Sequence, residues 1–364
     1  MKNIKLKLTA ISPIHTGSGE VYEPTNFIID ENSQKQLVLY HFRDEDFFEA
    51  LSNDKQQKFL KILNEMKEDS FIKIHKFVKE NKEIAKKISF LKVLVTKGIY
   101  EKYKKVIGQI AHLEKRGRSG NRVFNQFEIQ RIQRKQLKSS KTGNFTYVPY
   151  IPGSSLKGAI STAYKEFIYQ NYGERKLKEL FEDVRNMENL KFRFFKVADS
   201  KTTKPKSIIG FSLNKERFED DNTGPSTFIE VLNTGSEYIV DITFDENEIN
   251  FNDIKIACNN HYEPIFNKML DGEAENISGY FSDKLYNYYC DLKLKPNQFL
   301  LRVGKHSGAR AVTIDGLRDI SIRENRRKTI HHQSEETTTW LFGNNENSNT
   351  NLQPFGWVLC EIIS

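Results

Sequence analysis

Seventy consecutive residues, 44–113, contain no proline and only two glycines, which sets them apart from the rest of the chain. Apolar residues recur there at spacings of three and four, as at Phe59, Ile62 and Met66, and this is the periodicity of amphipathic helices. The segments on both sides instead show strand patterns. We therefore expect an α+β protein in which several helices are inserted into a β-containing domain.

Strand patterns begin at the N-terminus, where Ile4, Leu6 and Leu8 alternate with polar residues. A signal peptide needs a continuous apolar stretch, so none is expected here. The C-terminal half is mainly β, with a helical region at 260–290 that is interrupted near Asp271. The strands expected in that half are 191–197, 207–213, 227–232, 237–244, 299–303 and 357–362. Residues 344–353, rich in Asn and Ser, are expected to form a loop or to be disordered.

Cysteine and hydropathy patterns exclude several classes of protein. The three cysteines are far apart and form no CxxC pair, which excludes a disulfide framework and a four-cysteine zinc site. His331 and His332 lack partners at metal-ligand spacing, so no metal and no cofactor are expected. The longest apolar runs are only a few residues, too short for a membrane span. We expect a cytoplasmic protein in a reducing compartment.

Charge is concentrated in one part of the sequence. The chain has a net charge of +8, but residues 55–141 alone contain 24 Lys and Arg against 8 Asp and Glu. Within 115–141, nine basic residues accompany a single acid, and Phe124 and Phe127 lie among them. Arginine suits phosphate and aromatic rings can stack on bases, so this stretch predicts nucleic-acid binding, although a solvated charged loop is the plainer alternative. The arginines concerned are Arg116, Arg118, Arg122, Arg131 and Arg134. Neither a helix nor an extended hairpin fits 123–137 well, so both stay open.

Three glycine loops follow expected strands or open expected helices. The first is His15, Thr16, Gly17, Ser18 and Gly19, whose backbone donors could line a phosphate path. His15 could act as a general acid or base in RNA cleavage, since the pKa of histidine is about 6.5. With no second acid or base nearby in sequence, we favour a structural role for His15.

The second loop opens a helix at residues 153–158 and holds Gly153, Ser154, Ser155, Lys157 and Gly158. A helix N-terminus with glycines can bind phosphate, and a lysine in the first turn opposes the helix dipole unless an anion is present. An ordinary capped helix explains the pattern equally well. The segment is not a nucleotide-binding P-loop, because Ala159 follows where that motif needs Lys and Ser or Thr. The third loop, with phosphate contact or simple turn formation as alternatives, is surrounded by Arg302, Lys305, His306 and Arg310.

Taken together, the loops resemble those of the RAMP superfamily of CRISPR-associated RNA-binding proteins. The resemblance rests on 12–19 (SPIHTGSG), 150–159 (YIPGSSLKGA), 197–200 (VADS), 228–232 (FIEVL), 301–304 (LRVG) and 354–357 (PFGW). It covers essentially the whole chain, although the helical insertion carries no motif. In length, insertion and motif order the chain is most similar to the fifth Csm subunit of type III-A effector complexes.

The resemblance implies a ferredoxin-like or RRM-like core, partly duplicated, with a helical insertion. The implied division is residues 1–43 with 142–215, an inserted segment 44–141, and a β-rich half at 216–364. It implies a backbone subunit that binds CRISPR RNA and caps the head of the complex at the 3′ end of the guide. Implied partners are a sibling RAMP subunit, the small helical subunit and host nucleases that mature the RNA 3′ end; no membrane partner is implied.

The sibling repeated subunit cuts target RNA with an aspartate shortly after its first loop, where this chain has Pro24 beside Glu23. Because proline supplies neither acid nor ligand, we expect no enzymatic activity and no catalytic residue. The alternative is a metal-independent endoribonuclease of the same superfamily that uses His15. A third possibility is a scaffold that binds only proteins.

Overall fold

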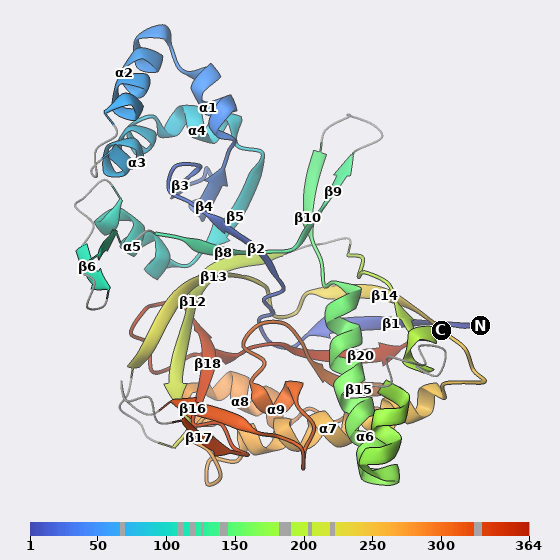
Figure 1. Cartoon of the computed structure of the whole chain (residues 1–364). Coiled ribbons are helices and arrows are strands. Elements are labelled where there is room, and N and C mark those ends of the chain that lie inside the picture. Colours follow the sequence, from blue (N-terminus) through green and yellow to red (C-terminus); the bar gives the residue numbers. More distant parts are fainter. Residues whose placement is uncertain are drawn as a thin grey trace.

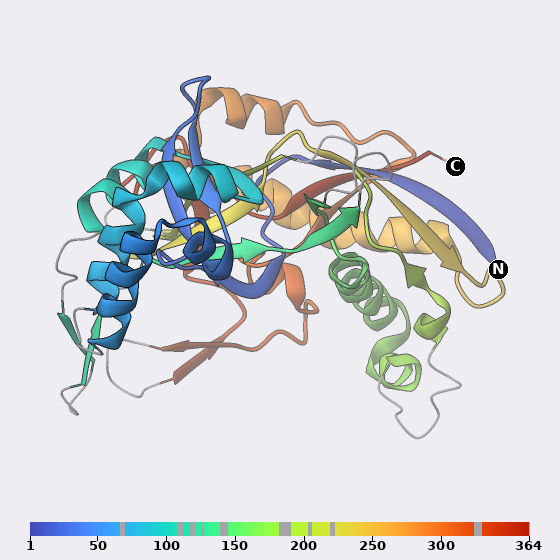
Figure 2. The ribbon, with the colours of Figure 1, turned by 90° about the horizontal axis from the view of Figure 1, so that it is seen from above.

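The computed structural model describes most of the chain (Figure 1). The described residues are 1–65, 70–107, 113–116, 121–124, 127–138, 145–181, 191–202, 206–218, 223–323 and 330–363. The fold is mixed α and β, as expected, with two main twisted sheets. Both chain termini lie at one end of the molecule, and the group of helices α1–α5 lies toward the other (Figures 1 and 2).

Five strands of the described residues form the first sheet, which is antiparallel throughout. Their order is β11 (Lys196–Val197), β14 (Glu237–Phe244), β1 (Lys2–Ala10), β20 (Trp357–Ile362) and β15 (Gln298–Arg302). The N-terminal alternation is confirmed, because Ile4, Leu6 and Leu8 are buried. Helices α6 (Gly153–Phe181) and α7 (Phe251–Leu270) share one hydrophobic core with this sheet (Figure 1).

Nine strands of the described residues form the second sheet. The main order is β2 (Gly17–Tyr22), β8 (Ile129–Ile132), β13 (Thr223–Leu232), β12 (Ser207–Glu216), β5 (Leu91–Val95), β4 (Leu37–His41) and β3 (Phe27–Glu31). In addition, β18 (Thr338–Gly343) pairs with β12 and with β19 (Gln353–Pro354). Residues 11–16 connect β1 to β2 and so link the two sheets.

The helical segment predicted between the β-rich flanks is present, with one exception. Its helices are α1 (Asp44–Ala50), α2 (Asn53–Asn64), α3 (Ser70–Glu80), α4 (Lys82–Ile88) and α5 (Lys97–Val106). Much of this group packs around its own cluster, centred on Phe47, Phe77 and Val78. The exception is β5, a strand where we expected helix, because the buried Leu91, Val93 and Val95 alternate with exposed residues and pair with β4.

The described part of the basic stretch 115–141 is extended rather than helical. It contains β6 (Leu113–Arg116), β7 (Asn121–Phe124), β8 and β9 (Arg134–Lys138). Strand β9 pairs with β10 (Phe145–Pro149) to form a hairpin that stands away from the body of the molecule (Figure 1).

The remaining elements cover the C-terminal half. They are η2 (Lys191–Phe194), η3 (Ser278–Tyr280), α8 (Asp283–Cys290), α9 (Ala309–Val312), β16 (Ile320–Arg323) and β17 (Ile330–Gln333). The predicted interruption near Asp271 is confirmed, because α7 ends at Leu270. The Asn-rich segment is a loop that Glu346 ties down through an ion pair with Lys102 at 2.7 Å.

Candidate nucleic-acid interface

Three loops that are far apart in the sequence meet at one pocket of about 430 Å³. Each of the three predicted glycine loops contributes to its wall, and the segment after β8 adds a fourth side. The lining residues are His15, Thr16, Gly17, Gln133, Tyr150, Pro152, Ser154, Ser155, Asp199, Gly304 and Lys305. The structure therefore brings together the first loop, the start of the second and the start of the third.

The first loop is held by backbone contacts on both sides. Ile14 pairs with Leu232 at the end of β13, and the Lys305 amide donates to the His15 carbonyl at 2.8 Å. Gly304 has φ +85°, and a Cβ there would lie 2.4 Å from the His15 carbonyl oxygen. Only glycine combines this left-handed conformation with so close an approach. The third loop thus fixes the first.

His15 is buried, with 2% of its surface exposed, and its ring is oriented from one side. Its Nδ1 lies 2.7 Å from the Glu230 carbonyl oxygen. Because a carbonyl can only accept, Nδ1 carries the proton and Nε2 of the neutral ring is an acceptor. Burial lowers the pKa of His15, so the ring is neutral at pH 7.

The second loop begins α6, whose first amide already has an acidic partner. The Gly153 amide donates to Asp199 Oδ1 at 2.9 Å, and Asp199 Oδ2 lies 3.2 Å from Lys135 Nζ. The Gly153 amide and Lys135 together hold the pKa of Asp199 below its usual range. Gly153 is required by the chain itself, since a Cβ would lie 2.2 Å from the Val197 carbonyl oxygen. Ser154 and Ser155 line the pocket.

Lys157 and Gly158 lie outside the pocket. The Lys157 ammonium lies over the Phe192 ring, 5.5 Å from its centre, and burial lowers the pKa of Lys157. No atom lies within 4 Å of a Cβ built on Gly158 in the part of the chain that the structure describes. Lys157 therefore packs against Phe192 and not at the pocket, and its expected contact with a phosphate stays a prediction.

The predicted arginines of the basic stretch fall into three groups. Arg134 is buried and pairs with Glu230, and it also donates to Ser207 Oγ at 3.0 Å. Arg131 pairs with Glu20 at 2.7 Å, near Ser18, whose hydroxyl donates to the Arg131 carbonyl at 3.4 Å. For Arg116 and Arg122 the structure gives only the backbone, in β6 and β7, and Arg118 lies outside the described residues. Gly19, with φ +83°, lies in β2 and outside the pocket.

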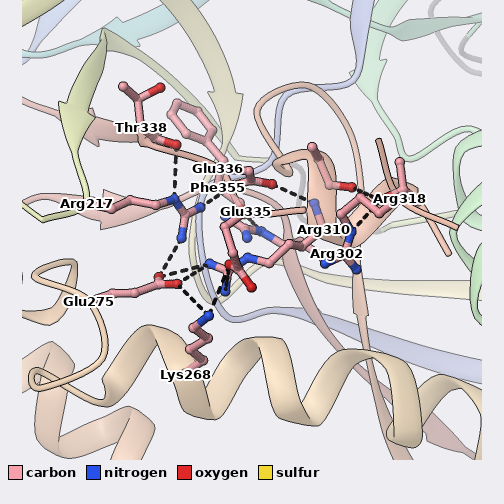
Figure 3. A network of polar contacts seen from close by, with 12 residues as sticks. Arg217, Lys268, Glu275, Arg302, Arg310, Arg318, Glu335, Glu336, Thr338 and Phe355 are labelled. Carbon is pink, nitrogen blue, oxygen red and sulfur yellow. Dashed lines mark hydrogen bonds and ion pairs between the residues drawn. The ribbon is translucent and has the colours of Figure 1, made fainter. Parts of the chain in front are cut away.

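Most charged residues of the third loop point into the protein, and only Lys305 reaches the pocket. Figure 3 shows Arg302 and Arg310 in an internal network of arginines and glutamates. The Arg302 guanidinium donates to the Phe355 carbonyl at 3.0 Å, and that of Arg310 pairs with Glu275 at 2.7 Å. His306 stacks on Trp340, and burial lowers its pKa to about 3. Arg302 and Arg310 are buried and bind groups of the interior, which corrects their predicted place at an RNA surface. His306 is half-buried, and its contact with RNA stays a prediction.

Four important residues were not in the predicted site, although Gln133 lies in the basic stretch and Tyr150, Asp199 and Glu230 lie in motifs that carry the family resemblance. Gln133, Tyr150 and Asp199 line the pocket, and Glu230 orients both His15 and Arg134 from beneath. Asp199 lies within a motif that supports the family resemblance, which was the one available signal for it. No group of three or more metal-binding side chains occurs within the described residues, and no helix there could span a membrane.

Comparison with known proteins supplies a family and a fold. The model of the RAMP superfamily matches residues 7–280. A chain in the cryo-EM structure of a Csm–crRNA–target RNA ternary complex from a type III-A CRISPR-Cas system has a TM-score of 0.61 at 16% identity, covering 99% of this chain and 100% of that one. The crystal structure of Csm5 from T. onnurineus has a TM-score of 0.54 at 16% identity, covering 97% and 99%. Among curated proteins, none matches significantly.

Proposed function

Because the chain belongs to the RAMP superfamily, we propose that it is a CRISPR RNA-binding backbone subunit of a type III-A effector complex. The observation that carries this proposal is the meeting of three glycine loops at one polar pocket. Two similar folds support it, one of them from a complex solved with crRNA and target RNA. The similarity spans nearly the full length of all three chains.

The pocket suits the RNA backbone better than a base. Lys305 is exposed at its edge and supplies one positive charge, and the hydroxyls of Ser154 and Ser155 supply neutral donors. Contacts of this kind position a strand without reading its sequence. We therefore expect RNA binding with little base preference and a steep dependence on salt.

The finer role that we propose follows the family resemblance. The chain caps the head of the complex at the 3′ end of the guide RNA and supports maturation of that end by host nucleases. Its partners are a sibling RAMP subunit and the small helical subunit. The ferredoxin-like, partly duplicated core and the division into 1–43 with 142–215, 44–141 and 216–364 belong to the same proposal.

The test of RNA binding compares two lysines on the surface. Lys305→Ala removes the pocket cation, whereas Lys201→Ala removes an exposed lysine that pairs with Asp241 and does not line the pocket. Binding of single-stranded RNA is measured from low to high salt. Lys305→Ala should weaken binding and reduce the slope of log affinity against log salt by about one. Equal effects of the two variants would argue against the pocket as the RNA site.

The alternative, a metal-independent endoribonuclease, has one observation in its favour. His15 lines the pocket as a neutral ring with an acceptor at Nε2, which is what a general base requires. We propose the non-enzymatic role because Pro24 stands where the sibling subunit has its aspartate. Cleavage of repeat RNA by the purified chain, abolished in His15→Ala, would establish the alternative instead.

A further inference from the structure

The pocket presents several hydrogen-bond acceptors, and an anion, which is itself an acceptor, cannot bind to them. Asp199 uses one oxygen for the Gly153 amide and the other for Lys135, yet a carboxylate has about four lone-pair sites and accepts further bonds. Its side chain is 44% exposed, on the pocket wall. A second acceptor is Nε2 of the neutral His15.

Two neighbouring side chains use donors within the protein and leave acceptors on the pocket side. The Gln133 amide nitrogen donates one of its two N–H groups to the Gly17 carbonyl at 3.2 Å, and the amide oxygen remains an acceptor. The Thr16 hydroxyl donates to the Tyr150 carbonyl at 3.3 Å, so its lone pairs remain. A ligand that fits this wall has to bring hydrogen-bond donors of its own.

Lys305, Ser154 and Ser155 suit a phosphate, but the acceptors described above do not, because a phosphate diester only accepts and a carboxylate beside it is repulsive. The donors along an RNA backbone are the ribose 2′-hydroxyls, which DNA lacks. We propose that Asp199 accepts a hydrogen bond from a ribose 2′-hydroxyl and makes the pocket select RNA over DNA. This inference rests on the proposed RNA-binding function and names the part of the ligand that the pocket recognises.

Capping of α6 alone does not explain a carboxylate at this position. The Gly153 amide needs one oxygen, which an asparagine of the same shape also supplies. The second oxygen is the one that would read the sugar, and an asparagine replaces it with an amide nitrogen that cannot accept. Asp199→Asn therefore separates the two roles within one residue.

Asp241 is a matched control for Asp199. Its carboxylate lies 3.1 Å from Lys201 and its side chain is 42% exposed, close to the corresponding values of Asp199, but it does not line the pocket. The loss of either negative charge raises affinity for any polyanion, whether RNA or DNA. The ratio of the two affinities cancels this effect, so the ratio is the quantity to measure.

The experiment measures binding of the full chain to single-stranded RNA, to DNA of the same sequence and to fully 2′-O-methylated RNA at one salt concentration. The unmodified protein should prefer RNA over both by about tenfold or more, the effect expected for one hydrogen bond to a charged group. Asp199→Asn should bring the ratios close to one, and Asp241→Asn should keep them. Asp199→Ser, which also removes the carboxylate, should repeat the result if the asparagine variant is unstable.

The outcomes separate this inference from the function on which it rests. If the unmodified chain binds no RNA, the proposed function fails. If it binds RNA but Asp199→Asn and Asp199→Ser retain the preference over DNA, the function stands and the role of Asp199 is wrong. A preference that follows the base rather than the sugar would also overturn it, because Asp199 would then contact a base amine.

Discussion

At the scale of single residues, Glu230 supports the pocket in two ways. Its carbonyl accepts from His15, while its carboxylate pairs with Arg134 and accepts from the Tyr22 hydroxyl at 3.1 Å. Burial alone would raise the pKa of Glu230, but Arg134 outweighs burial and holds that pKa below its ordinary value. Glu230 is therefore a charged residue that positions others from the interior.

Replacement of Glu230 should be costly, because Arg134 would remain buried without its counter-charge. We expect Glu230→Gln to lower the free energy of unfolding by about 3–5 kcal/mol. Glu230 contributes fully to stability above its unfolded-state pKa, and this contribution is lost as pH falls through its folded-state pKa. Acid should therefore destabilise Glu230→Gln less than it destabilises the unmodified protein. Chemical denaturation at several pH values measures both effects. Glu237→Gln, which breaks an exposed pair with Lys7, should cost about 1 kcal/mol at most.

Two glycines with the same backbone conformation differ in their surroundings. Gly304 has φ +85° and faces the His15 carbonyl, whereas Gly235 has φ +81° and no atom within 4 Å of a built Cβ among the described residues. Gly235→Ala should cost only the roughly 1–2 kcal/mol of left-handed strain. Gly304→Ala should cost more and should also weaken RNA binding, because the first loop must move. Equal melting temperatures and equal RNA affinities for the two variants would contradict the proposed fixing of the loop.

The sequence pattern identified the loops correctly but not the roles of the arginines. His15, Ser154, Ser155 and Lys305 meet at one pocket, which the separate loop patterns did not predict, and their contact with RNA stays a prediction. We expected Arg134, Arg302 and Arg310 at the surface because their partners are distant in sequence. These partners are carboxylates for Arg134 and Arg310 and the Phe355 carbonyl for Arg302. Arg134 and Glu230, for example, are 96 residues apart. Local patterns contain no information about such pairings.

At the scale of elements, the β9–β10 hairpin presents basic and aromatic groups away from the body of the protein. Lys138 lies over the Phe145 ring, 5.9 Å from its centre, and Phe145 is half exposed. If RNA leaves the pocket along this hairpin, Lys135 and Lys138 contact phosphates. The double variant Lys135→Ala, Lys138→Ala should reduce the salt slope by about two, one for each contact. Lys55→Ala, Lys61→Ala on α2 should leave the slope unchanged, and a similar reduction in both would show a non-specific charge effect.

Helices and strands were predictable from the spacing of apolar residues wherever that spacing continued over many residues. The helices of 44–113 and the alternating β1 were predictable for that reason. Strand β5 was missed because five residues between helices carry too little pattern, and its pairing with β4 supplies the missing information. In the described part of 115–141, β8 pairs with β2 and β13, which are distant in sequence, whereas β6 pairs with β7 and β9 pairs with the nearby β10.

At the scale of the whole molecule, one buried charge network joins segments from across the C-terminal half. Arg217, at the end of β12, pairs with Glu275 at 2.5 Å and with Glu336 (Figure 3). Arg217→Met leaves two buried carboxylates with fewer partners and should lower the free energy of unfolding by about 3–5 kcal/mol. Lys178→Met, which breaks an exposed pair with Glu174, should change it by less than about 1 kcal/mol. Thermal unfolding of both variants measures the difference, and similar values would contradict a structural role for the network.

The central claim is that this chain is an RNA-binding subunit of a larger CRISPR effector complex. The most direct measurement is purification of the chain from cells that express the whole complex, followed by sizing of bound RNA and identification of its partners. The account predicts guide RNA with one defined 3′ end, together with sibling RAMP subunits. Recovery of the chain free of RNA, or with RNA of random length and no RAMP partner, would contradict it.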